Sequence, residues 1–162
     1  MTETIRRNVK KSMQAAEALY HRLILVVGES GSGKTTILRA LAEENHCPLI
    51  NVSLAISKEL LELTEKQRVL RLQEIIDKIA DEVESPLFFD NLEILFDKQL
   101  KQDPLRLLQR ISRNRIVIAS WNGRYNNKRL SYAEIDHPEY RTYDSVDTLV
   151  VCMDGTSTID SI

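Results

Sequence analysis

The stretch that decides the fold covers residues 23–35 and reads Leu23-Ile24-Leu25-Val26-Val27-Gly28-Glu29-Ser30-Gly31-Ser32-Gly33-Lys34-Thr35. Its first five residues are apolar without alternation, which is typical of a strand buried on both faces of a parallel sheet. The other eight satisfy in full the spacing GxxxxGK followed by Ser or Thr. A helical pattern with Ile37, Leu38 and Leu41 on one face comes next. A strand, a glycine-rich turn and a helix in this order bring backbone N–H groups together around phosphate.

The residue types of this loop fit the chemistry of phosphate binding. The chain has only five glycines, yet three of them fall within six positions here, where the backbone must turn back on itself. Lys34 supplies a positive charge to the β and γ phosphates, and Thr35 offers a hydroxyl to Mg²⁺. The residues predicted to bind the nucleotide form one run: Gly28, Glu29, Ser30, Gly31, Ser32, Gly33, Lys34, Thr35 and Thr36.

The loop resembles the Walker A motif of P-loop NTPases, and the resemblance extends from Leu23 to Met153. Such folds pair it with a Walker B strand of apolar residues that ends in Asp, and Leu87-Phe88-Phe89-Asp90 fits. The resemblance implies that Asp90 holds Mg²⁺ with Thr35, that Lys34 and Asp90 are the catalytic residues, and that the ligand is ATP. The alternative for Asp90 is an ordinary residue that ends a strand or caps a helix.

Outward from the loop, strand and helix patterns alternate. The predicted strands are Leu23–Val27, Leu49–Val52, Leu87–Asp90, Ile116–Ala119 and Leu149–Cys152. The predicted helices are Thr4–Tyr20, Gly33–Asn45, Lys58–Val83 with a break near Thr64, and Asp103–Ser112. Alternation of this kind predicts an α/β fold, here the three-layer P-loop NTPase fold: a five-stranded, mainly parallel sheet with helices on both faces and no separate lid domain.

The length and composition suit one domain with a single large core, since the chain has 162 residues of which 43% are hydrophobic. We expect one P-loop nucleotide-binding domain over residues 1–162. It divides into an N-terminal amphipathic helix at 1–21, a core at 22–153 and a short tail at 154–162. The stretch from Trp121 to Val146 has no clear periodicity, and we expect a structured functional loop or a short helix there.

The set of residues expected to support ATP hydrolysis is less complete than the phosphate-binding loop. The residue after the Walker B Asp is commonly Glu in AAA+ and related NTPases, but here it is Asn91, which cannot accept a proton. Glu93 should point elsewhere unless the chain turns after the strand. Ser120 or Asn122 could act as a polar sensor of the γ-phosphate, or Asn122 and Gly123 could form a turn. We therefore expect hydrolysis to be slow or to depend on a partner.

Charge is unevenly distributed along a chain whose net charge is only −2. No Asp or Glu lies between Pro104 and Ala133, whereas the last 29 residues carry seven acids and one base. We call the stretch from Pro104 to Ala133 the basic segment. It has seven cations: Arg106, Arg110, Arg113, Arg115, Arg124, Lys128 and Arg129. It could support a head-to-tail homo-oligomer in which Arg113 or Arg115 enters a neighbour's nucleotide site, contact DNA or RNA phosphates, or simply be solvated.

No strongly apolar run approaches the length of a membrane span, so we expect no membrane partner and a cytoplasmic protein. Cys47 and Cys152 are isolated thiols without metal-ligand spacing. The N-terminal helix carries Arg6, Arg7, Lys10 and Lys11 beside an apolar face. Packing on its own domain is favoured over docking on a partner or a membrane surface.

The small size, the absence of a helical lid after the fifth strand and the segment His137-Pro138-Glu139-Tyr140-Arg141 resemble the BrxF family of P-loop proteins from bacteriophage-exclusion (BREX) systems. The resemblance implies a bacterial anti-phage component that works with a larger ATPase, a DNA methyltransferase, a helicase and a phosphatase-like protein.

The leading hypothesis is an ATP-binding, AAA+-like protein whose nucleotide state controls assembly or switching. A small-molecule kinase is an alternative, although kinases usually place acidic acceptor-binding residues after the second strand, where this chain has Asn51-Val52-Ser53-Leu54. A DNA-binding regulatory subunit with a structural nucleotide is another. A GTPase is disfavoured because Asn127-Lys128 is followed by Arg129 and Leu130 and does not form the guanine-reading sequence NKxD.

Overall fold

The computed structural model describes residues 1–161, with the side chains of residues 1–159, and has the expected alternation of helices and strands. The helices are α1 (Thr2–Ala16), α2 (Lys34–Glu44), α3 (Val52–Leu60), α4 (Glu65–Asp81) and α5 (Pro104–Ile111). The strands are β1 (Leu23–Gly28), β2 (Leu49–Asn51), β3 (Leu87–Asp90), β4 (Val117–Asn126), β5 (Arg129–Tyr132), β6 (Arg141–Tyr143) and β7 (Leu149–Cys152). Short 3₁₀ helices cover η1 (Glu93–Phe96), η2 (Lys98–Leu100) and η3 (Thr158–Ser161).

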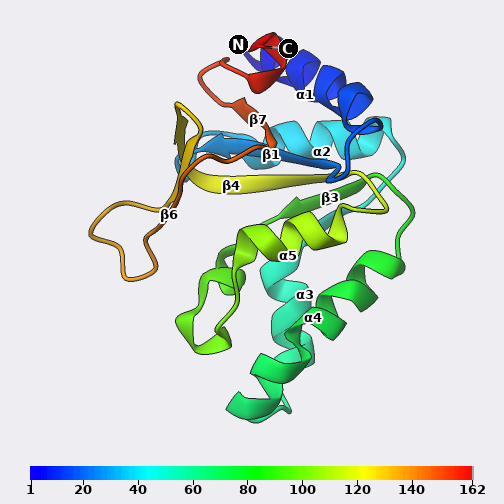
Figure 1. Cartoon of the computed structure of the whole chain (residues 1–162). Helices are drawn as coiled ribbons and strands as arrows, with labels where there is room; N and C mark the ends of the chain where they lie inside the picture. Colours follow the sequence, from blue (N-terminus) through cyan, green and yellow to red (C-terminus); the bar gives the residue numbers. More distant parts are fainter. Residues whose placement is uncertain (162) are drawn as a thin grey trace.

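The central sheet has the strand order β2-β3-β4-β1-β7, and these five strands are all parallel (Figure 1). Gly28 at the end of β1 is paired in register with Asn122 of β4. Asn51 at the end of β2 is paired in the same way with Asp90 of β3. The carboxyl ends of the strands therefore meet at one edge of the sheet, where ligands of open α/β sheets bind.

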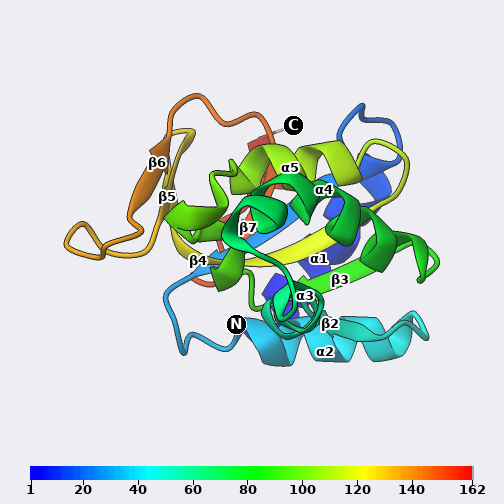
Figure 2. The ribbon, with the colours of Figure 1, turned by 90° about the horizontal axis from the view of Figure 1, so that it is seen from below.

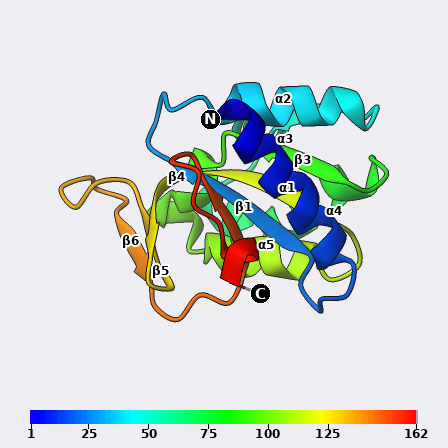
Figure 3. The same cartoon turned by 90° about the horizontal axis from the view of Figure 1, so that it is seen from above.

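Helices cover both faces of this sheet, so the predicted fold class is confirmed. Figure 3 shows α1 crossing over one face beside α2, and Figure 2 shows α3, α4 and α5 over the other. The side chains of β1 alternate between the two cores: Ile24 and Val26 pack under α1 and α2, whereas Leu25 and Val27 pack with α3, α4 and α5. Burial on both faces explains why β1 reads as a continuous apolar run.

The N-terminal helix packs on its own domain, as its apolar face predicted. Ile5, Val9 and Ala16 of α1 are buried in the core over β1 and β7. Lys10 Nζ lies 2.9 Å from a carboxylate oxygen of Glu44 in α2. The helix ends at Ala16 rather than at Tyr20, because the chain turns there to enter β1. Among the described residues, no helix is both long and apolar enough to span a membrane.

The break expected near Thr64 is present. The Thr64 hydroxyl oxygen accepts from the backbone N–H of Gln67, and the Gln67 side chain accepts from the backbone N–H of Thr64. This capping box starts α4. The helix before the break begins at Val52 rather than at Lys58, because the Asn51 side chain accepts from the N–H of Leu54 and caps α3 directly after β2.

The stretch from Trp121 to Val146 contains strands rather than the predicted structured loop or short helix, so that prediction was wrong. β4 continues to Asn126, turns through two residues with φ of 50° and 65°, and returns as β5, which pairs with β6. The parallel sheet thus carries two further antiparallel strands. Of the two alternatives for Asn122, a turn with Gly123 is excluded, because both residues lie within β4. A Cβ on Gly123 would lie 1.8 Å from the Ser131 carbonyl oxygen of β5, so the glycine permits the strands to approach.

Candidate functional site

The glycine-rich loop connects β1 to α2 at the carboxyl edge of the sheet. Gly31 and Gly33 have φ of 81° and 99°, a region that residues with a Cβ rarely adopt. Gly28 is required for a different reason: a Cβ there would lie 2.5 Å from Ser32 Oγ and 2.7 Å from Met153 Cγ. Each of the three glycines therefore serves the shape of the loop.

Lys34 lies inside the curve of the loop, with only 6% of the residue exposed. Its ammonium group donates to the carbonyl oxygens of Gly28 (2.9 Å) and Glu29 (2.6 Å) and to Ser32 Oγ (3.2 Å). Burial lowers the pKa of Lys34, while the negative charges of Asp90, Glu93 and Glu29 oppose this change. The loop thus folds around a partly desolvated cation that has acids on several sides.

Thr35 and Asp90 meet next to this lysine. The Thr35 hydroxyl donates to Asp90 Oδ2 at 2.7 Å, and the Ser120 hydroxyl donates to Asp90 Oδ1 at 2.6 Å. Hydroxyl and carboxylate oxygens are hard ligands of the kind Mg²⁺ prefers. Among the described side chains, those of residues 1–159, no group of three His, Cys, Asp or Glu forms a metal cage. The donor set therefore fits an ion held by one or two protein oxygens together with phosphate.

The chain turns sharply after β3, and this turn decides where Glu93 lies. Asn91 has φ of 57°, in the left-handed region that Asn tolerates better than most residues. Its carbonyl oxygen accepts from the Ser53 backbone N–H (2.9 Å) and from Ser53 Oγ (2.7 Å). Glu93 consequently points back across the site, where its carboxylate accepts from Asn122 Nδ2 at 2.7 Å. The Asn91 amide lies between Asn51 and Glu93.

Three alternate residues of β4 present polar side chains to the site, because successive side chains of a strand point to opposite faces. We call Ser120, Asn122 and Arg124 the β4 row. Each bonds a different acid: Ser120 bonds Asp90, Asn122 bonds Glu93, and Arg124 Nη2 donates to Glu29 Oε1 of the loop at 2.8 Å. The residues between them face the other core or the β5 backbone. From the sequence alone, Arg124 was counted only among the basic residues. It follows Ser120 by four positions, which places both side chains on the same side of a strand, and this spacing could have indicated that Arg124 belongs to the site.

Most cations of the basic segment are paired within the chain. Arg110 lies 3.0 Å from Asp77 and Arg115 lies 2.8 Å from Asp81, both carboxylates of α4. The Arg113 guanidinium lies over the Tyr20 ring, 4.7 Å from its centroid. Arg113 and Arg115 thus precede the amino end of β4, at the opposite edge of the sheet from the loop. The segment is a set of separate ion pairs rather than a continuous bare surface.

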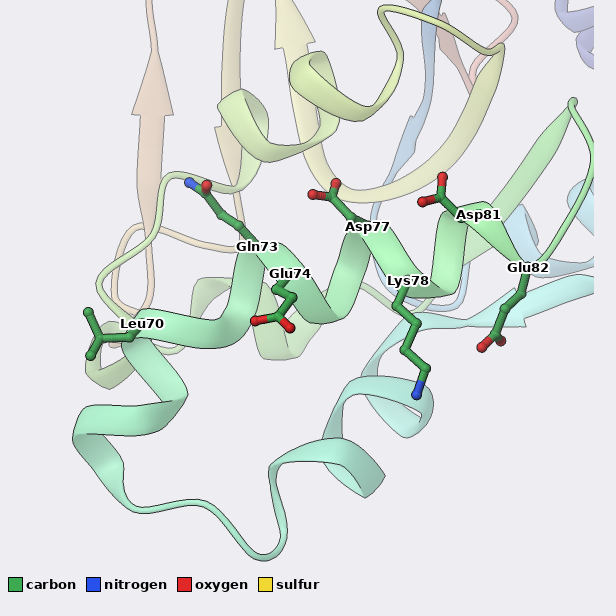
Figure 4. Close-up of a pocket in the computed structure, with 7 residues that line it drawn as sticks. All are labelled: Leu70, Gln73, Glu74, Asp77, Lys78, Asp81 and Glu82. Atoms are coloured by element: carbon green, nitrogen blue, oxygen red, sulfur yellow. The ribbon is translucent and has the colours of Figure 1, made fainter.

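Two hollows in the described part of the surface differ in whether they reach the loop. A groove of about 1360 Å³ extends from Gly28, Glu29 and Arg124 along β7 to His21. The other, about 650 Å³, is a shallow hollow on α4 lined by Leu70, Gln73, Glu74, Asp77, Lys78, Asp81 and Glu82 (Figure 4). Its lining comes from one helix, and Asp77 and Asp81 already bond arginines of the basic segment. It has no connection to the loop.

The sheet order, the loop and the acid that ends β3 define the class of the protein: a P-loop NTPase fold with a nucleotide-binding loop. The chain belongs to the AAA domain family, whose model matches residues 18–119. No curated protein and no solved structure matches the chain. The matched range contains the loop, Asp90 and Glu93 but ends within β4, so Asn122, Arg124 and the β4–β5 hairpin lie beyond it.

Proposed function

We propose that the protein binds ATP with Mg²⁺ and works as a nucleotide-dependent switch that hydrolyses ATP slowly. One observation carries the proposal: the Thr35 hydroxyl bonds Asp90 at 2.7 Å directly beside a complete phosphate loop. The loop places backbone N–H groups and the positive end of α2 toward phosphate. Lys34 would exchange its carbonyl partners for phosphate oxygens.

Thr35 and Asp90 are the residues that would hold the metal ion. When bound, Mg²⁺ neutralises part of the charge of the β and γ phosphates. The hydrogen bonds of Ser120 and Thr35 to Asp90 fix the carboxylate before any ligand arrives. Such preorganisation lowers the cost of ordering the site on binding.

Glu93 is the carboxylate that we propose for positioning the attacking water. Asn91 occupies the usual place of that acid, but its left-handed backbone turns the chain so that Glu93 lies beside Asn122. Glu93 is also close enough to Lys34 to affect its pKa. In this structure Glu93 Oε1 accepts from Asn122 Nδ2, which holds the carboxylate beside Asn122 rather than in the usual place of that acid. This supports slow turnover that a partner could accelerate.

Steady-state ATP turnover of the purified chain tests this assignment. Glu93→Gln should abolish the residual turnover, whereas Asn91→Gly should retain most of it, because glycine keeps the left-handed backbone that positions Glu93 and Asn91 contributes no proton acceptor. Equilibrium ATP binding by both variants should stay within a few-fold of the unmodified protein. Unchanged turnover in Glu93→Gln, or turnover that is fast in the unmodified protein, would contradict the proposal.

We further propose that this switch belongs to a bacterial anti-phage system of the BREX type. The resemblance carried by the segment His137–Arg141 supports this assignment. Co-purification with the larger ATPase and the methyltransferase of such a system should then depend on ATP. Lys34→Ala should remove the dependence; equal recovery with and without nucleotide would contradict a switch.

Homo-oligomer formation is part of the same proposal. The mass of the protein in solution should increase when ATP and Mg²⁺ are added, and Lys34→Ala should prevent the increase. DNA contact by the basic segment is a separate possibility with its own signature, because retention on DNA would weaken steeply with salt. Charge reversal at Arg106, an exposed member of the segment, should then reduce retention.

A further inference from the structure

We propose that Arg124 contacts the terminal phosphate of the bound nucleotide in the same chain that supplies the loop. The inference rests on the proposed function, and it assigns a charged residue that lies outside the range matched by the AAA domain model. It makes Arg124 a specificity-determining residue that favours triphosphate over diphosphate.

The first observation is the contact between Arg124 and the loop itself. Arg124 Nη2 donates to Glu29 Oε1 at 2.8 Å, and Glu29 is the second residue of the loop whose N–H groups surround phosphate. The Arg124–Glu29 ion pair thus joins the basic segment to the loop. The guanidinium is therefore positioned at the mouth of the phosphate site by an acid that belongs to the loop.

The second observation is the direction of the β4 row. Asn122 is in register with Gly28, the last residue of β1, so Arg124 stands two residues beyond the point where β1 ends and the loop begins. Arg124 and Asn122 point to the same side of β4. Asn122 bonds Glu93, the acid that we place next to the attacking water. The β4 row thus extends from Asp90, the proposed metal ligand that Ser120 contacts, to Glu29 of the loop, which Arg124 contacts.

The third observation is that the pair with Glu29 can be exchanged at low cost. The side chains of Arg124 and Glu29 are 68% and 62% exposed, and ion pairs this exposed contribute little to stability. Phosphate accepts two parallel hydrogen bonds from a guanidinium and carries more charge than one carboxylate. The Arg124 backbone is paired with Ser131 of β5, so only side-chain torsions need to change.

The arginines favoured by the sequence do not have this geometry. Arg113 lies over Tyr20 and Arg115 bonds Asp81, both at the amino end of β4. Either one could reach a nucleotide only in a neighbouring subunit. Arg124 needs no second subunit, and the experiment below separates the two arrangements.

Equilibrium affinities for ATP and ADP, each with Mg²⁺, test the assignment. Arg124→Ala should weaken ATP binding about tenfold or more while ADP binding changes less than threefold, because a hydrogen bond between charged groups is lost only with the terminal phosphate. Arg129→Ala is the matched control: it removes the same charge from the same hairpin, at a residue that lies 3.7 Å from Asp144 rather than near the loop. It should change neither affinity more than twofold.

Glu29→Gln provides a second, opposite readout. Removing the carboxylate leaves Arg124 with the more distant Glu134, at 3.7 Å, as its remaining ion-pair partner, and should strengthen ATP binding more than ADP binding. This gain in ATP affinity should vanish in a variant that also carries Arg124→Ala, because no guanidinium is then present to leave residue 29 and bind the terminal phosphate. Equal effects on ATP and ADP in all these variants would overturn the assignment.

Mixing two variants tests whether the arginine acts within its own chain. Arg124→Ala and Lys34→Ala subunits are combined, and ATP affinity of the mixture is measured. No recovery of tight binding is expected; recovery would mean that a neighbour supplies the arginine and would overturn the proposal. If the unmodified protein binds no ATP, the proposed function itself fails, whereas ATP binding that is insensitive to Arg124→Ala refutes only this inference.

Discussion

At the scale of single residues, the site consists of acids whose positions are fixed by neighbouring donors. Asp90 accepts from Thr35 and Ser120, and Glu93 accepts from Asn122. Lys34 is the cation in the middle of this set, and it donates to the loop carbonyls. The arrangement places negative charge where a metal ion and a water would be held, and positive charge where phosphate would lie.

The protonation of Lys34 leads to a prediction about pH. Burial lowers its pKa, so Lys34 loses its proton at a lower pH than an exposed lysine does. Phosphate binds the charged form and raises the pKa again, so binding takes up a proton at alkaline pH. ATP affinity should therefore decrease as pH rises toward the ordinary lysine pKa of about 10.4. Calorimetric titrations between neutral pH and pH ~10 measure this; affinity that stays constant over the range would contradict it.

At the scale of elements, the β4–β5 hairpin is the addition that shapes this site. Trp121 Nε1 donates to the Ser131 carbonyl oxygen at 2.9 Å, and the Tyr132 ring stacks on Phe96 of η1 with centroids 3.4 Å apart. The hairpin thereby holds η1, the 3₁₀ helix that begins at Glu93. Within the described part of the chain, the connection from β4 to β7 contains no helix of the kind that usually crosses between parallel strands.

Gly123→Ala should disrupt this hairpin, because the added Cβ would lie 1.8 Å from the Ser131 carbonyl oxygen. We expect a loss of about 1–3 kcal/mol in the free energy of unfolding. Fluorescence of Trp121, the only tryptophan, should shift to the red as its burial decreases. Asn126→Ala, an exposed change in the same strand, is the control. Equal stability of the two variants would show that the hairpin does not depend on the glycine.

The cap of α4 gives a further prediction at this scale. Thr64→Ala removes one half of the capping box and should lower the free energy of unfolding by about 1 kcal/mol. Ser57→Ala, at an exposed position inside α3, should not destabilise the protein. Urea unfolding of both variants provides the comparison, and an unchanged midpoint for Thr64→Ala would exclude the capping role.

The elements show where sequence reasoning succeeds and where it stops. β1, β3 and β7 follow from continuous apolar runs, because parallel strands are buried on both faces. The extension of β4 could not be read in this way, since Asn122, Gly123 and Arg124 are polar or flexible and their strand partner is set by a distant segment. The position of Glu93 depends on the left-handed backbone of Asn91, which a residue pattern does not reveal. The family resemblance assigned Thr35 and Asp90 to the same Mg²⁺ ion, and in the structure the two side chains are hydrogen-bonded to each other.

At the scale of the whole molecule, the residues of the candidate site all come from one chain and one edge of the sheet. The loop, the acid that ends β3 and the β4 row lie together, while Arg113 and Arg115 lie at the other edge. Both chain ends lie on the side of the sheet covered by α1 (Figure 1). The large groove along β7 opens next to the loop.

A site built within one chain predicts that the monomer binds ATP by itself, because every proposed ligand of the phosphates is local. Fluorescence titrations at protein concentrations low enough to keep the protein monomeric should therefore still show saturable ATP binding. If ATP also promotes association, ATP affinity must increase at higher protein concentration, because the two equilibria are linked. Loss of ATP binding in the monomer would show that a second subunit completes the site.

The most direct measurement of the central claim is a calorimetric titration of ATP with and without Mg²⁺ into the unmodified protein and into Asp90→Asn. The account predicts that the unmodified protein binds ATP more tightly when Mg²⁺ is present. Asp90→Asn should keep Mg²⁺-independent binding through the loop and lose most of the gain from Mg²⁺. Absence of ATP binding in the unmodified protein, or a Mg²⁺ effect of the same size in Asp90→Asn, would contradict the account.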